Sequence, residues 1–129
     1  GEGATRHIVI RVLHAKTEGA ARRIGAVIAT SPLFKTAMHG ADPNWGRIMA
    51  ALGRAGVPLN PDRVDIRFGP LTVCRRGQKA AFSERQAHRI LCSRDVLVTV
   101  DLHQGAAAAE YATCDFSRAY IDINAHYHT

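Results

Sequence analysis

The run HIVIRVL, residues 7–13, gives the first clear indication of the fold. Its alternating pattern predicts a strand, and apolar residues at both sets of alternating positions predict that the strand is well covered. A second run, VLVTV at residues 96–100, is nearly all apolar and predicts another strand, in a sheet covered on both faces. Between the two runs, apolar residues recur at helical spacing. The sequence therefore predicts an α/β fold.

Three helices are predicted, and each has a local signal at one of its ends. A helix begins at about Glu18 and should end at Ser31, because the proline that follows disfavours helical geometry in the residue before it. A second helix is expected to be capped by Asp42, with the next proline in its first turn, and to stop at Gly56. A third follows the capping-box pattern of residues 83–86.

The remaining strands are predicted from alternation. Residues 64–68 alternate as a half-buried strand, and a Gly-Pro turn leads into residues 71–74 as a hairpin. Residues 105–116 are ambiguous, because their alanines favour a helix while their polar positions alternate as in a strand. Residues 119–128 alternate clearly. The predicted order is a strand, two helices, two strands, a helix and three strands, in one domain that spans residues 1–129.

The composition is ordinary for a soluble globular protein, with 47% hydrophobic residues in 129 and a formal net charge of +6. The basic residues are scattered and only 6% of the residues are aromatic, so nucleic acid is a poor candidate partner. A solvated surface, or attraction for acidic small molecules, is the better interpretation of the charge. The sequence has no apolar run of membrane-spanning length and no signal peptide, so we expect a cytoplasmic protein without a membrane partner.

Local catalytic motifs are missing. The sequence has no GxSxG, no Walker loop and no GxGxxG. The three cysteines, Cys74, Cys92 and Cys114, are widely spaced and form no CxxC pair, so we expect reduced structural thiols rather than a disulfide or a zinc site. The residues alone therefore show no complete active site.

Three places still hold candidate residues. Glu2 lies between two glycines, which let a ligand approach the backbone, and its carboxylate could pair with an ammonium group; the alternative is a solvated turn acid. Asn44, Trp45 and Arg47 lie at a helix start, which favours anions; the alternative is a core tryptophan beside a surface arginine.

The third place is the C-terminus, where alternate residues share one face of the last predicted strand. Their spacing is compatible with a divalent metal, although terminal histidines are more often solvated. The residues are Asp122, Asn124, His126 and His128.

Several stretches together resemble one family in their order and rough spacing. They are GEGATR (1–6), SPLFKTAMHGADPNWGRIMAALGRAGV (31–57), PDRVDIRFG (61–69), VTVDL (98–102) and CDFSRAYIDINAHYHT (114–129). The family is that of the ornithine acetyltransferases, also called bifunctional glutamate N-acetyltransferases, of arginine biosynthesis. The resemblance covers nearly the whole chain.

The resemblance implies a two-chain enzyme made by self-cleavage of a precursor. In the family, the threonine that begins the β chain is the nucleophile, which takes an acetyl group from N-acetylornithine and passes it to glutamate. Bifunctional members also use acetyl-CoA as a substrate, and the α chain supplies the oxyanion donors. That threonine has no counterpart here, since Gly1 lacks the hydroxyl and Thr5 is internal. We therefore expect a partial chain, the C-terminal portion of a β chain, that holds no catalytic residue and is inactive alone.

Three substrate-binding residues follow from the resemblance. Glu2 would hold an amino group of ornithine or glutamate, and Asn124 and Thr129 match the family's C-terminal substrate contacts. Positions 124 and 129 differ by an odd number, so a regular strand would point them to opposite faces. If both touch one ligand, the backbone must bend between Ala125 and His128. The family has variable residues at positions 126 and 128, so we expect no metal.

The resemblance also implies the fold and the assembly. The family fold is a layered α/β sandwich with helices packed outside mostly antiparallel sheets, and it favours a strand for residues 105–116. The implied partners are an α chain and the rest of the β chain in an α2β2 heterotetramer, without a cofactor. The alternatives are a non-catalytic fragment that binds an amino acid or a protein, and a relative in secondary metabolism with another acceptor. A threonine at a cleavage site in the upstream reading frame would favour the enzyme.

Overall fold

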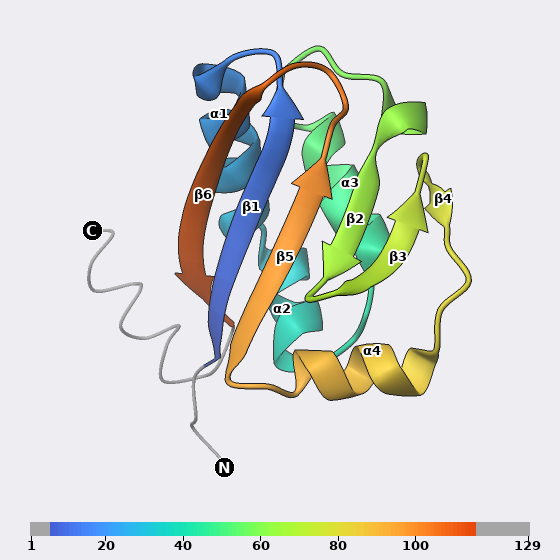
Figure 1. The fold of residues 1–129 in the computed structure, drawn as a ribbon. Helices are drawn as coiled ribbons and strands as arrows, with labels where there is room; N and C mark the ends of the chain where they lie inside the picture. The colour runs from blue at the N-terminus through green and yellow to red at the C-terminus, as the bar shows by residue number, and fades with distance from the viewer. Residues whose placement is uncertain (1–5, 116–129) are drawn as a thin grey trace, which may run out of the picture.

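The computed structural model of the chain describes residues 6–115, which form one mixed sheet and its helices (Figure 1). The strands lie in the order β4-β3-β2-β5-β1-β6. The pair of β1 with β5 is parallel, and the other four pairings among the described residues are antiparallel. The strands are β1 (His7–Ala15), β2 (Asp65–Phe68), β3 (Leu71–Arg75), β4 (Gln78–Lys79), β5 (Asp95–Asp101) and β6 (Ala107–Cys114).

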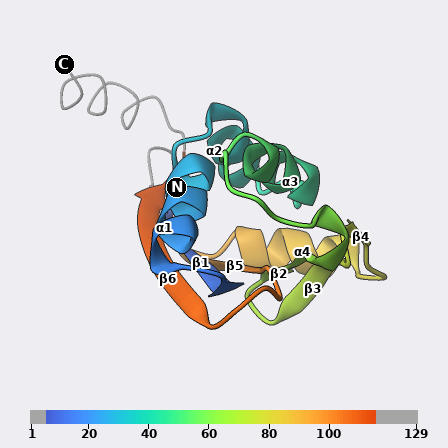
Figure 2. The ribbon, with the colours of Figure 1, turned by 90° about the horizontal axis from the view of Figure 1, so that it is seen from above.

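The helices of the described residues lie on one side of this sheet. Figure 2 shows α1, α2 and α3 side by side over one face, while α4 lies across the end of the sheet at the turn between β2 and β3. This arrangement confirms the α/β fold with helices outside a mostly antiparallel sheet. The helices are α1 (Glu18–Ala29), α2 (Pro32–His39), α3 (Trp45–Gly53) and α4 (Glu84–Leu91), with a 3-10 helix, η1, at Pro61–Arg63.

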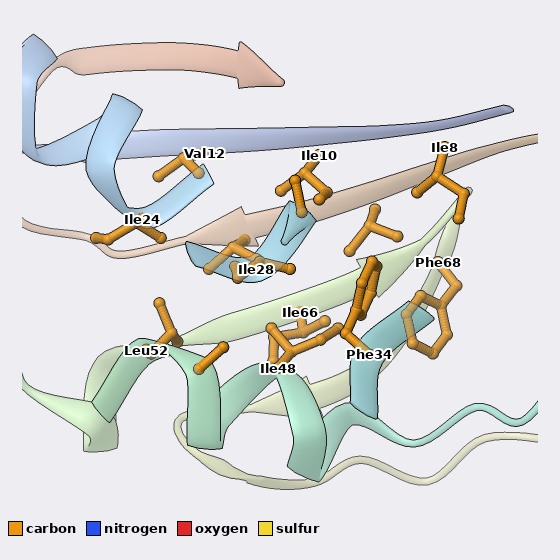
Figure 3. Close-up of a cluster of buried hydrophobic side chains, with 14 of the residues drawn as sticks. Ile8, Ile10, Val12, Ile24, Ile28, Phe34, Ile48, Leu52, Ile66 and Phe68 are labelled. Carbon is orange, nitrogen blue, oxygen red and sulfur yellow. The ribbon is translucent and has the colours of Figure 1, made fainter. Parts of the chain in front are cut away.

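The core lies between the sheet and α1, α2 and α3. In β1 the residues that face the helices are at most 1% exposed, whereas those between them are half-buried. β1, which was expected to be well covered, is thus fully buried by residues 6–115 only on the face toward the helices. Burial of each large apolar side chain stabilises the fold by about 1.5–3 kcal/mol. The side chains in Figure 3 include Ile8, Ile10, Val12, Ile24, Ile28, Phe34, Ile48, Leu52, Ile66 and Phe68.

The structure contains a helix, α2, that the sequence analysis missed. Helix α1 ends at Ala29, close to the predicted end, but Ser31 does not lead into a loop. Instead its hydroxyl oxygen accepts a hydrogen bond from the Phe34 amide at 3.3 Å, and Pro32 occupies the first turn of α2. The same Ser-Pro pair that ends one helix therefore caps the next.

The predicted ends of α3 also need correction. Its N-cap is Asn44, whose side-chain oxygen accepts a hydrogen bond from the Arg47 amide at 3.2 Å, and not Asp42. The helix ends at Gly53, three residues before the predicted stop at Gly56. Gly56 has a φ of +69° and so lies in the loop after the helix.

Residues 107–114 form a strand despite their alanines, as the resemblance implied. The strand pairs antiparallel with β1 along most of its length, and Glu110 accepts a hydrogen bond from Arg11 at 2.7 Å. Close packing against α1 also holds it, because a Cβ at Gly25 would lie 3.3 Å from the Cβ of Tyr111. Pairing and packing thus override the helix propensity of alanine. The last predicted strand, residues 119–128, lies outside the described residues.

Candidate functional site

A buried aspartate joins the start of β1 to the end of β6. Asp115 is 0% exposed, and its Oδ1 accepts a hydrogen bond from the Arg6 amide at 2.9 Å. In return, the Asp115 amide donates to the Arg6 carbonyl at 3.3 Å. The residue before β1 is therefore bonded to the residue after β6.

The Arg6 side chain extends this contact to helix α2. Its Nη1 donates to the carbonyls of Met38 and His39 at 2.9 and 2.7 Å and lies 3.4 Å from Asp115 Oδ2. The His39 ring nitrogen Nδ1 lies 3.1 Å from the same carboxylate oxygen. A cation at the last carbonyls of a helix is favourable, since these carbonyls have no partner within the helix. We refer to Arg6, His39 and Asp115 as the Asp115 cluster.

The surroundings of the Asp115 cluster are buried and charged. Lys35 of α2 is only 6% exposed. Burial raises the pKa of the Cys114 thiol, the Asp115 carboxylate raises this pKa further, and the charge of Lys35 acts in the opposite direction. Cations and a carboxylate therefore gather at this end of the sheet, where α2, β1 and β6 meet.

The three predicted substrate-binding residues lie outside the described residues. In the sequence, Glu2 precedes Arg6 by four positions, and Asn124 and Thr129 follow Asp115 by nine and fourteen. The bend predicted between Ala125 and His128, and the C-terminal residues considered as metal ligands, also lie outside the described residues. Within residues 6–115, no group of three or more His, Cys, Asp or Glu side chains is placed to hold a metal ion.

Asn44, Trp45 and Arg47 have structural contacts that favour the simpler interpretation of this stretch. Trp45 is half-buried and packs against the core. The Arg47 Nη1 donates to the Leu33 carbonyl at 2.8 Å and so joins α3 to α2. Asn44 is the cap of α3. Arg47 thus joins two helices, and Asn44 caps one of them.

Sequence reasoning did not single out the Asp115 cluster, although its members lie within the stretches that carried the family resemblance. Arg6 and Asp115 are 109 positions apart, and His39 ends a helix that the sequence analysis missed. The available signal was a charged residue directly before one predicted strand and another near the end of the ambiguous stretch 105–116. That signal points to a cluster only once β1 and β6 are known to be neighbours.

The comparisons with known proteins point to one family. A family model described as "ArgJ family" matches residues 1–129. The chain belongs to the ArgJ family. The resemblance drawn from the sequence stretches is thereby confirmed.

Relatives named arginine biosynthesis bifunctional protein ArgJ align with almost the whole length of the chain. The protein of Desulfotalea psychrophila is 47% identical over 128 residues, which cover 98% of this chain and 33% of the relative. That of Geobacillus stearothermophilus is 43% identical and is covered to 32% of its length. The chain thus spans about a third of the length of the curated ArgJ relatives it matches.

A solved ArgJ structure shares the fold. The crystal structure of arginine biosynthesis bifunctional protein ArgJ from Bacillus halodurans superposes with a TM-score of 0.88 at 37% sequence identity. The match covers 98% of this chain and 60% of that one. Among the described residues, no helix has the length and apolar character needed to cross a membrane.

Two of the three cysteines, Cys74 and Cys92, should differ in their reactivity toward thiol reagents. Cys74 is buried, and burial raises the pKa of its thiol, whereas Cys92 is exposed and its Sγ lies 3.4 Å from His88 Nε2. Because the thiolate is the reactive form, we expect a thiol reagent at pH 8 to modify Cys92 at least about tenfold faster than Cys74. Mass spectrometry of peptides from the native protein after timed labelling measures both rates. Equal rates would contradict the burial of Cys74.

Proposed function

We propose that this chain forms part of an acetyltransferase that moves the acetyl group of N-acetylornithine to glutamate in arginine biosynthesis. Membership of the ArgJ family supports the proposal, since its relatives carry the name arginine biosynthesis bifunctional protein. In this proposal the nucleophilic threonine lies outside the 129 residues, in a preceding part of the protein, and acetyl-CoA is a second acetyl donor. The same proposal includes a cytoplasmic α2β2 assembly with no cofactor.

The Asp115 cluster is the observation that supports a substrate site at this end of the sheet. It bonds the residue that follows the Glu2 segment to the residue that precedes the Asn124 and Thr129 segment. In the sequence, Glu2 precedes Arg6 by four positions, and Asn124 and Thr129 follow Asp115 by nine and fourteen. The cluster thus joins the two chain positions from which the segments that the proposal assigns to the substrate continue.

The proposed residues have matching chemistry. A glutamate carboxylate pairs with the ammonium group of an amino-acid substrate, an asparagine amide both donates and accepts, and a threonine hydroxyl does the same. Acyl transfer itself requires a nucleophile and a base, which an N-terminal threonine combines through its hydroxyl and amine. Residues of this chain would bind and orient the substrate while the reaction takes place at the threonine.

Replacing Glu2 with glutamine tests the assignment. In the complete gene product, Glu2→Gln should raise KM for the amino-acid substrates about tenfold or more, because a charge-assisted hydrogen bond contributes about 1.5–3 kcal/mol. Glu18→Gln is the matched control, since Glu18 is an exposed acid of α1 that pairs with Arg22. Steady-state kinetics of acetyl transfer from N-acetylornithine to glutamate measure the effect. An unchanged KM for both substrates would exclude the proposed role of Glu2.

The two alternative functions predict different outcomes of the same assay. A fragment that only binds an amino acid would show no transfer even within the complete gene product. A relative with another acceptor would show transfer, but glutamate would be a poor substrate compared with a different amino acid. The sequence upstream of Gly1 separates the first alternative directly, since the enzyme requires a threonine at a cleavage site.

A further inference from the structure

A second candidate site lies at the opposite edge of the sheet from the Asp115 cluster. A pocket of about 1100 Å³ adjoins the β3–β4 hairpin, η1 and the start of β2. Its lining includes four cationic side chains, those of Arg63, Arg75, Arg76 and Lys79. Two carboxylates, of Asp62 and Asp65, also line it.

The guanidinium groups of Arg63, Arg75 and Arg76 could all bind a ligand. Each is exposed, and within residues 6–115 none of their guanidinium groups has a hydrogen-bond or ion-pair partner. Lys79 is partly engaged, because its Nζ lies 3.4 Å from Glu84 Oε1 and 5.4 Å from the centre of the Phe82 ring. The pocket therefore presents three guanidinium groups whose N–H donors make no hydrogen bond or ion pair among the described residues.

The better-covered carboxylate of the pocket is already engaged with other groups. Asp65 Oδ1 accepts a hydrogen bond from the Arg76 amide at 2.9 Å, and Oδ2 lies 2.8 Å from His103 Nε2. Burial tends to raise the pKa of Asp65, but these hydrogen bonds and the charges of His103 and Arg75 outweigh it and lower the pKa. The carboxylate of Asp65 is thus ionised at neutral pH, and both of its oxygens already have partners, the Arg76 amide and His103.

The wall of the pocket is held in place by its own contacts. His103 stacks on His14, with ring centres 6.1 Å apart and planes inclined by 11°. The His103 amide donates to Asp101 Oδ1 at 3.1 Å. The turn of the β3–β4 hairpin has φ values of +51° at Arg76 and +76° at Gly77. The Gly77 amide donates a hydrogen bond at 2.9 Å to the carbonyl of Val64, the residue before β2. Arg76 therefore projects from a turn with defined geometry, Arg75 from the end of β3 beside it, and Arg63 from η1.

We propose that this pocket binds a small molecule that carries two or more phosphate groups. Guanidinium groups bind phosphate oxygens through paired, charge-assisted hydrogen bonds, and three of them exceed what a single carboxylate would require. The volume is slightly above the range of about 300–1,000 Å³ found for small-molecule sites, so a ligand of that size has room to enter. A nucleic-acid strand is less suitable, because no Phe, Tyr or Trp is among the described residues that line the pocket. The proposal does not depend on acetyl transfer.

Calorimetric titration of the complete gene product with pyrophosphate at low salt tests the proposal. The variant Arg63→Gln, Arg75→Gln, Arg76→Gln should bind pyrophosphate at least about tenfold more weakly, as expected when three charged contacts are lost. The control variant Arg85→Gln, Arg89→Gln, Arg94→Gln removes the same charge from exposed arginines that do not line the pocket, and should bind within about twofold of the unmodified protein.

Three results would overturn the proposal. They are absence of pyrophosphate binding, equal weakening in the two triple variants, and malonate binding as tight as that of pyrophosphate. Circular dichroism checks that each variant is folded, and if the triple variant fails this check, Arg63→Gln alone should still weaken binding while Arg89→Gln should not. Because no acetyl transfer is measured, failure here is distinct from failure of the proposed function.

Discussion

Replacing Asp115 with asparagine in the complete gene product is expected to lower the free energy of unfolding by about 1–3 kcal/mol, the size found when a buried polar group loses a hydrogen-bond partner. Asparagine keeps the shape but replaces one carboxylate oxygen with an amide nitrogen. The Asp115 side chain is only 1% exposed, so water cannot replace the lost acceptor. If the new amide nitrogen replaces Oδ1, it faces the Arg6 amide, and if it replaces Oδ2, it faces the side chains of Arg6 and His39. In both cases two hydrogen-bond donors then face each other.

Urea unfolding of Asp115→Asn beside Glu110→Gln measures this effect. Glu110 lies on the same strand, β6, and its Oε2 is 2.7 Å from Arg11 Nε, but both side chains are well exposed, at 54% and 41%. A surface pair of this kind contributes about 0–1 kcal/mol. If the two variants were equally stable, the Asp115 cluster would contribute no more than an ordinary surface pair.

The same variant should also change substrate binding, if the proposed function holds. The cluster anchors both segments that the proposal assigns to the substrate, so loosening it should raise KM for N-acetylornithine more than it lowers kcat. A purely structural role would lower the amount of active enzyme and hence the apparent kcat, with KM unchanged. Kinetics at a temperature where the variant is fully folded separate the two effects.

The strands could be predicted from the sequence more reliably than the limits of the helices. Alternation and apolar runs indicated β1, β2, β3 and β5 because these patterns follow directly from burial on the faces of a sheet. The helix α2 was missed because a Ser-Pro pair has two physical meanings, the end of one helix and the cap of another. Which meaning applies depends on whether Phe34 finds a core to enter, and that core is made by distant residues.

The candidate sites were predictable only in part, for a similar reason. Neither the pairing of Arg6 with Asp115 nor the placement of His103 beside Asp65 follows from local sequence, because each joins residues far apart in the chain. The β3–β4 hairpin had a local signal, since Arg76-Gly77 resembles a two-residue turn that needs positive φ at both positions. The signal was weak, because β4 has two residues and no apolar alternation.

A single methyl group added at Gly77, in that turn, should also lower the stability of the fold strongly. Its φ is +76°, and a Cβ built there would lie 2.5 Å from the Pro61 carbonyl oxygen and 3.2 Å from its carbonyl carbon. Both atoms belong to the backbone of η1, so a side-chain rotation cannot relieve the contact. We expect Gly77→Ala to lower the free energy of unfolding by about 2–4 kcal/mol, the sum of the left-handed conformation and the forced displacement.

Gly56→Ala separates these two contributions. Gly56 has nearly the same φ, +69°, but a Cβ built there would meet nothing within 4 Å. It should therefore cost only the conformational part, about 1 kcal/mol. Urea unfolding of both variants measures the difference, which reports the contact with η1. The displaced turn also carries Arg75 and Arg76, so Gly77→Ala should weaken pyrophosphate binding while Gly56→Ala should not. Equal losses of stability in the two variants would mean that the hairpin and η1 are not in contact in solution, and the pocket between them would lose its wall.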